Sequence, residues 1–281
     1  MRRLKLIFIL IKKSIQGWGD DNASQLAAAI AYYTIFSIPP ILIIALSVAG
    51  HFFDTDLAKN QLITQIGGFI GQGSADFIKS LLENSTKTST GLIASIISIG
   101  VLLAGATGIF YQIQFALNKI WKVPKKLPVS LLKTLQFHTQ SFLVILILSS
   151  LLSVFIGNVN GFTQNVVLLE VSNFFVLFIT VTVLFAIIYR VIPDKAITWG
   201  DVWLGASVTG LLFMLGKYAI GFYLTFSKSG STYGTAGALI VLLVWIYYSA
   251  QIFLFGAEFT HIYSMKLGSH PAPESTTISK L

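Results

Sequence analysis

The sequence predicts an all-α membrane protein, a polytopic bundle of six transmembrane helices. The chain has 281 residues, of which 54% are hydrophobic and only 11% are charged, whereas soluble domains carry about 25% charged residues. The charges are also clustered, which leaves six long stretches with one charge or none. Crossing a hydrocarbon layer of about 30 Å takes roughly 20 apolar residues. A soluble protein with six such helices would have nothing left to face water, so that class is excluded.

The first element, residues 1–19, is predicted to be a basic amphipathic helix at the membrane surface. Its apolar residues recur at helical spacing, and five basic residues surround them: Arg2, Arg3, Lys5, Lys12 and Lys13. Such a helix lies in the interface, where its charge favours the anionic inner leaflet of the lipid bilayer. We do not expect a cleaved signal, because the apolar core is short and no small-residue cleavage site follows it.

The transmembrane domain is predicted over residues 20–266. Its six spans have the expected boundaries 23–51, 91–116, 137–159, 171–192, 200–226 and 234–263. The connection 52–90 is expected to form two short amphipathic helices, with Asp56 and Ser74 as N-caps, that cap the bundle on its extracytoplasmic face. Residues 267–281 are expected to be a disordered cytoplasmic tail.

The basic residues predict the orientation of the chain. Fourteen Lys and Arg residues fall on the side of the two termini, and only four fall in the opposite loops. Cytoplasmic loops retain positive charge, so both termini are predicted to be cytoplasmic. This topology also accounts for the net charge of +8, so no nucleic-acid partner is expected.

Pro39 and Pro40 predict a break in the first span. Proline removes a backbone hydrogen bond, and its ring clashes with the preceding turn. Broken helices build substrate sites near the midplane of many transporters. A simple packing kink is the alternative interpretation, and the sequence leaves both open.

Small residues form stripes along three spans. Such stripes let helix backbones approach closely, so we interpret them as packing seams within the bundle; they permit an oligomer without indicating one. Their members are Ser24, Ala27, Ala28 and Ala31 in the first span, Gly100, Ala104 and Gly108 in the second, and Ala206, Gly210 and Gly221 in the fifth.

The last span carries a polar stripe that is the candidate substrate or ion site. Tyr247 and Gln251 each fall within about 20° of Glu258 on a helical wheel. Ionisable groups inside a membrane mark functional sites by default, which adds Lys217 of the fifth span. A vertical separation of about 16 Å at 1.5 Å per residue argues against pairing Lys217 with Glu258. Arg190, at the inner end of the fourth span, or His261 is the better partner. A structural ion pair and a proton- or substrate-binding role both remain open for Glu258.

Two stretches of the chain are recognisable. "ASQLAAAIAYYTIFSIPPILIIALSVAG" resembles the opening segment of the YihY/BrkB family of bacterial inner-membrane proteins, and "YGTAGALIVLLVWIYYSAQIFLFGAEF" resembles its closing Y-G-x-x-G and G-A-E signature. Between them, "VIPDKAITWGDVWLGA" resembles the family's short cytoplasmic turn. The resemblance implies a six-helix protein of the bacterial cytoplasmic membrane. Members have been labelled ribonuclease BN-like.

The motif content argues against an enzyme. A nuclease needs a metal cluster or a paired acid and base, and the four histidines show no metal-binding spacing. No cysteine is present, and no cofactor or metal site is expected. The favoured function is therefore a transporter or flux protein for a small solute or an amphiphile such as a lipid. The alternative is a non-transporting scaffold for envelope assembly.

Overall fold

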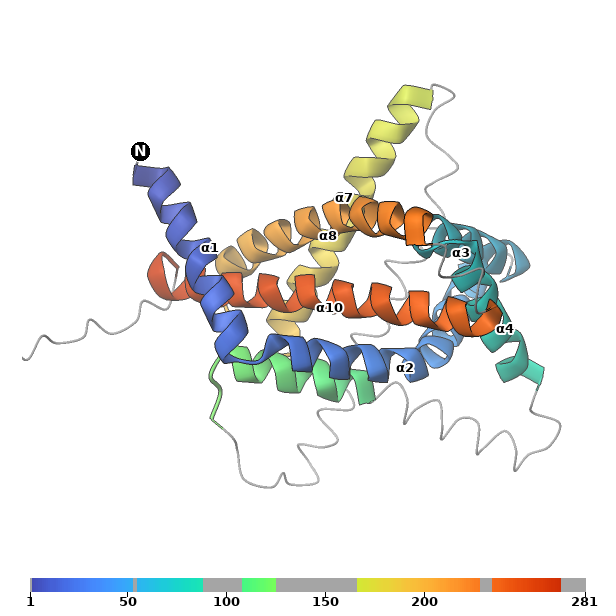
Figure 1. The fold of residues 1–281 in the computed structure, drawn as a ribbon, viewed down its shortest axis with the longest axis horizontal. Coiled ribbons are helices and arrows are strands. Elements are labelled where there is room, and N and C mark those ends of the chain that lie inside the picture. Colours follow the sequence, from blue (N-terminus) through green and yellow to red (C-terminus); the bar gives the residue numbers. More distant parts are fainter. Residues whose placement is uncertain (1, 53–54, 88–107, 125–165, 228–233, 269–281) are drawn as a thin grey trace, which may run out of the picture.

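The protein is described by a computed structural model that places residues 2–52, 55–87, 108–124, 166–227 and 234–268 (Figure 1). These residues contain helices and turns and no strand, which confirms the predicted all-α class. A further helical segment covers residues 108–120. The main helices are α1 (Arg2–Asp20), α2 (Ala23–Phe52), α3 (Thr55–Ile70), α4 (Gln72–Lys87), α7 (Val166–Val191), α8 (Trp199–Ser227) and α10 (Gly234–Lys266).

Some predictions lie outside the described residues. The third predicted span, 137–159, is one of them, and so are most of the second span and almost all of the tail. Two helical stretches, Trp199–Ile220 in α8 and Gly237–Lys266 in α10, are long and apolar enough to cross a bilayer. The count of six spans and the orientation of the termini therefore stay predictions.

Helix α10 is the centre of the bundle. It runs between α8 and α2, and α1 crosses it near its C-terminal end, whereas α3 and α4 lie at the opposite end (Figure 1). The larger apolar core joins α2, the 108–120 helix, α7, α8 and α10, with buried residues such as Leu117, Tyr189 and Leu254. A helix that is apolar all round needs neighbours or lipid on every side, and α10 has protein on most of its circumference.

Two reciprocal glycine contacts fix the register of α8 against α10. Thr260 of α10 packs on Gly205, and Thr209 of α8 packs on Gly256; a Cβ added to either glycine would lie within 2 Å of the facing hydroxyl oxygen. Each threonine hydroxyl donates to a carbonyl of its own helix, so both hydroxyls are hydrogen-bonded. The small residues here serve close packing. Gly205 and Gly256 were not among the predicted stripes, whereas Gly210 of the fifth-span stripe packs on Thr182 of α7.

Helix α2 is continuous through Pro39 and Pro40, so the predicted break in the first span is wrong. The two prolines remove two amide donors, but the amides on either side keep the helix together. Ser37 donates its hydroxyl to the Tyr33 carbonyl at 2.9 Å, one turn before the prolines, whereas the carbonyls that lose their amide donors are those of Ile35 and Phe36. A proline pair in a long, tightly packed helix costs stability without ending the helix.

The connection after α2 forms two helices, as predicted. Gly71, with a φ of 86°, separates α3 from α4, and glycine adopts this left-handed conformation without strain. The N-cap assigned to Ser74 is wrong, because α4 begins two residues earlier, at Gln72. Ser74 is instead buried and donates to the Ala238 carbonyl of α10 at 3.4 Å. The apolar faces of α3 and α4 thereby cover the N-terminal end of α10.

Candidate functional site

A buried acid, Asp21, holds together the turn between α1 and α2. Its carboxylate accepts two hydrogen bonds from the Lys122 ammonium, at 2.6 and 2.7 Å, and its backbone carbonyl accepts one from Lys119 at 2.5 Å. Asn22, with a φ of 53°, makes the turn that sends α2 back along the bundle. Asparagine tolerates this conformation better than most residues. The turn is thereby fixed to the C-terminal end of the 108–120 helix.

Glu258 lies directly beside this ion pair. Its side chain is only 1% exposed, and it points from α10 at α1, where a Cβ on Gly17 would lie 2.6 Å from Oε2. Asp21 lies one turn beyond Gly17, and its backbone amide donates to the Gly17 carbonyl at 2.9 Å, so the two carboxyl groups are neighbours. The other oxygen, Oε1, has no hydrogen-bond partner among the described residues. The site therefore contains two neighbouring carboxyl groups and one directly bound ammonium.

An aromatic and basic layer closes the site on its other side. His261, one turn beyond Glu258, is buried against Trp121, with ring centroids 5.0 Å apart. The Lys195 ammonium lies 5.3 Å from the centre of the Trp121 ring. We call Asp21, Lys122, Glu258 and His261 the polar cluster.

The rest of the predicted stripe continues from the polar cluster along α10. Gln251 is half-buried, and its buried Oε1 has no partner among the described residues. Tyr247, one turn further, is exposed. These residues share a face with Glu258, and the buried Leu254 lies between Gln251 and Glu258, so α10 carries polar groups at successive levels from the polar cluster to the exposed Tyr247.

Among the described residues no ion pair joins Arg190 to Glu258, so the predicted pairing with Arg190 is wrong. Its guanidinium lies 5.9 Å from the ring centre of Trp199. Arg190 does lie at about the level of Glu258 along the bundle, as predicted, since the adjacent Tyr189 contacts α10 at Gly256. Successive helix residues differ by about 100°, however, so Tyr189 points inward and Arg190 points along the outside of α7.

Lys217 is separate from the polar cluster, in agreement with the sequence argument. The adjacent Gly216 faces Tyr248 of α10. Tyr248 and Glu258 are about 15 Å apart along the helix axis at 1.5 Å per residue. The Lys217 ammonium lies 6.0 Å from the ring centre of Tyr218.

Pro39 and Pro40 are also far from the polar cluster. At 1.5 Å per residue, Pro39 is about 27 Å along α2 from Asp21. Its neighbours in the chain, Ile35, Ile38 and Leu46, pack in the second apolar cluster with α3 and α4. The structure thus divides the predicted site between two ends of the bundle.

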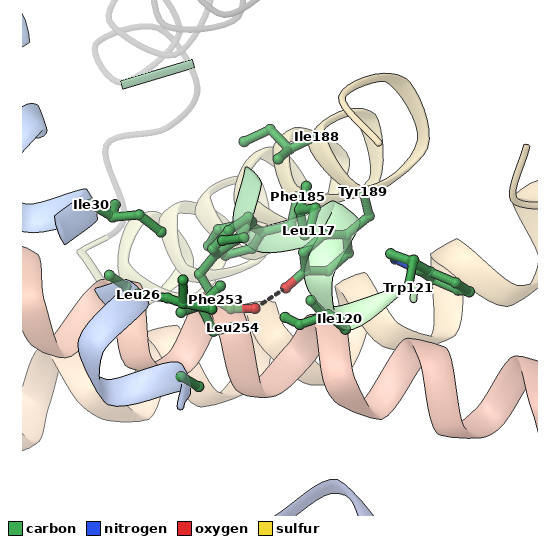
Figure 2. Close-up of a cluster of buried hydrophobic side chains, with 14 of the residues drawn as sticks. Leu26, Ile30, Leu117, Ile120, Trp121, Phe185, Ile188, Tyr189, Phe253 and Leu254 are labelled. Carbon is green, nitrogen blue, oxygen red and sulfur yellow. Dashed lines mark hydrogen bonds between the residues drawn. The ribbon is translucent and has the colours of Figure 1, made fainter. Parts of the chain in front are cut away.

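Tyr189 stabilises the crossing of three helices next to the polar cluster. Its hydroxyl donates to the Phe253 carbonyl at 2.6 Å (Figure 2). The same hydroxyl lies 3.1 Å from the Thr209 hydroxyl. The ring stacks on Phe253, with centroids 5.2 Å apart. One side chain of α7 therefore contacts both α8 and α10 through polar and apolar atoms.

We expect Tyr189→Phe to lower the free energy of unfolding by about 1 kcal/mol, the usual net value of one hydrogen bond. The ring stays in place, so the loss reports on the hydroxyl alone. Thermal unfolding of the detergent-purified protein measures it. Tyr218→Phe is the matched control, since Tyr218 is exposed; equal melting temperatures for the two variants would contradict the assignment.

Sequence reasoning missed Asp21, Lys122 and Gly17. Asp21 stands in "GWGDDNAS", where an acid before a helix is usually interpreted as an N-cap. Lys122 is one of several basic residues in its loop, and nothing in the sequence distinguishes it from the others. The available signal was Gly17: a glycine within an otherwise amphipathic helix indicates a close approach by another element. Which element approaches depends on tertiary structure.

These features define the class: a helical membrane protein with a buried polar cluster at one end of its bundle. The profile of the family described as "Virulence factor BrkB" matches residues 14–277. The chain belongs to this family, which confirms the predicted resemblance.

Several curated relatives carry the description "UPF0761 membrane protein". The chain is 25% identical over 264 residues to one from Pseudoalteromonas atlantica, covering 90% of this chain and 85% of the relative. It is 27% identical over 263 residues to one from Actinobacillus pleuropneumoniae, covering 90% and 92%. No solved structure matches the chain.

Proposed function

We propose that this chain is a multi-pass protein of the bacterial cytoplasmic membrane that moves a small solute or an amphiphile such as a lipid through its bundle. The polar cluster is the part of the bundle that would handle the substrate. One observation carries the proposal: Glu258 is 1% exposed, and its Oε1 has no partner among the described residues. A carboxyl that served only as structural glue would have both oxygens satisfied.

The polar stripe supports the same function. Gln251 also has an unpartnered buried oxygen, and Tyr247 extends the stripe to the exposed surface. Buried polar atoms are costly when unpaired, and within membrane proteins such residues line substrate and ion pathways. A chain of these groups along one helix face gives a polar solute or headgroup successive partners.

The placement in the membrane is part of the proposal. Ile7, Phe8, Ile11 and Ile15 of α1 are exposed on one side, and Lys5, Lys12 and Lys13 are exposed as well. Apolar and basic groups arranged in this way suit a helix seated in an anionic inner leaflet. Trp199 and Trp203 are exposed at the start of α8, and tryptophan is enriched at membrane–water interfaces. We therefore assign the polar cluster to the cytoplasmic end.

The proposal is tested by reconstitution into proteoliposomes. Flux is followed for cations, anions, neutral metabolites and fluorescent lipids, each against protein-free liposomes. Flux of at least one class above the protein-free rate is expected. If no class moves, and the protein instead co-purifies stably with envelope proteins in mild detergent, the non-transporting scaffold replaces this proposal.

A further inference from the structure

If Asp21 and Glu258 are both ionised, the two negative charges face only one directly bound ammonium among the described residues, that of Lys122. Asp21 is neutralised by Lys122, which binds both of its oxygens. A negative charge on Glu258 would then be a second anion next to the first, without an ammonium bound to it. Two carboxylates that share a buried site cannot both be ionised at low cost, which favours a proton on one of them.

Of the two acids, Glu258 is the better site for that proton. Both Asp21 oxygens already accept from an ammonium, whereas Oε1 of Glu258 has no partner among the described residues. The rest of the Glu258 side chain faces Gly17, which brings no donor from its side chain. We propose that Asp21 and Glu258 form a proton-binding carboxyl pair in which Glu258 carries the exchangeable proton and Lys122 neutralises Asp21.

A proton fits this site better than a metal ion does. Among the described residues there is no group of three or more His, Asp and Glu side chains that could hold a metal. Na⁺ or a divalent cation would need several oxygens, and it would be repelled by the ammonium already bound to Asp21. A proton needs one oxygen.

Four other charged or titratable groups lie near the carboxyl pair. They come from each element that packs there: Asp20, Lys119, Lys195 and His261. The Lys122 side chain is 60% exposed, so water reaches the pair from the Lys122 side. A proton on Glu258 can therefore exchange with solvent from that side, without opening the apolar core.

This proton binding does not depend on transport, although its use as the coupling ion rests on the proposed function. Infrared spectroscopy of the full chain in lipid nanodiscs measures it directly. At neutral pH we expect the band of one protonated carboxylic acid per chain, which disappears as the pH is raised. The band should be lost in Glu258→Gln and retained in Glu83→Gln, a control on the partly exposed Lys59–Glu83 pair.

A second variant separates a pair from a lone buried acid. Asp21→Asn removes the anion that Lys122 neutralises, so the ammonium becomes available to Glu258. We expect the band to disappear or to titrate at lower pH. A wild-type spectrum without the band, a band that persists in Glu258→Gln, or an unchanged titration in Asp21→Asn would each overturn the proposal. A band that behaves as expected in a protein without flux would overturn only the proposed function.

Discussion

Replacing Gly256 with valine is expected to separate α8 from α10 and to destabilise the whole bundle. A Cβ at this position would lie 1.8 Å from the Thr209 hydroxyl and 2.6 Å from the Tyr189 hydroxyl. Neither neighbour can move freely, because both are buried and hydrogen-bonded. Overpacking typically costs about 1–3 kcal/mol, and we expect about 3 kcal/mol here. The thermal transition of the purified protein measures the loss.

Gly200→Val is the matched control for this prediction. Gly200 lies in the first turn of α8, and a Cβ there would meet nothing within 4 Å. The control should unfold close to wild type, apart from the small difference in helix propensity between glycine and valine. Equal transitions for Gly256→Val and Gly200→Val would show that α8 and α10 do not cross where the structure places them.

The second large effect is expected from Lys122→Met, which leaves Asp21 buried beside Glu258 without its ammonium. Breaking a buried ion pair costs about 3–5 kcal/mol. The lysine side chain is 60% exposed and the aspartate side chain 7%, so solvent screening reduces the cost, and we expect roughly 1–3 kcal/mol. Asp21→Asn combined with Lys122→Met should recover most of the loss, because the buried anion is then gone.

A double-mutant cycle on thermal unfolding measures the coupling between Asp21 and Lys122. The control is the Lys59–Glu83 pair between α3 and α4, at 3.3 Å, in which the lysine side chain is 29% exposed and the glutamate side chain 38%. Exposed pairs contribute about 0–1 kcal/mol, so its cycle should give a small value. If the two cycles give the same coupling energy, Asp21 is not the buried anchor of the α1–α2 turn.

The G-A-E signature that carried the family resemblance has a physical explanation in the structure. At Gly256, helix α10 comes into close contact with Thr209 of α8 and Tyr189 of α7. Ala257 is fully buried in the apolar core. Glu258 points to the opposite side of α10, at Gly17 of α1. Three consecutive residues thus face three directions, and each position tolerates little change.

The sequence predicted those features that depend on local pattern. Clustered charges and long apolar runs predicted α8 and α10, and helical periodicity predicted α1 and the α3–α4 pair. The predicted break at Pro39–Pro40 was wrong because proline propensity is local, whereas packing of α2 against α3, α4 and α10 holds the helix together. Tertiary packing of this kind commonly overrides local propensity.

The partner of Glu258 was not predictable in the same way. Depth along the membrane follows from counting residues, and it correctly separated Lys217 from Glu258. The direction in which a side chain points depends on the rotation of each helix about its axis, which a single sequence does not give. Arg190 was therefore placed at a suitable depth but on the wrong face, and Asp21 was missed although it lies beside Glu258.

The central claim is that Glu258 acts in transport and does not merely hold the bundle together. The most direct test is flux per folded molecule in proteoliposomes for wild type and Glu258→Gln, with the thermal transition of each measured in parallel. Gln keeps the shape and hydrogen-bonding groups of the protonated acid but cannot release a proton. We predict at least a tenfold loss of flux with a transition close to wild type. Unchanged flux in Glu258→Gln would contradict the claim.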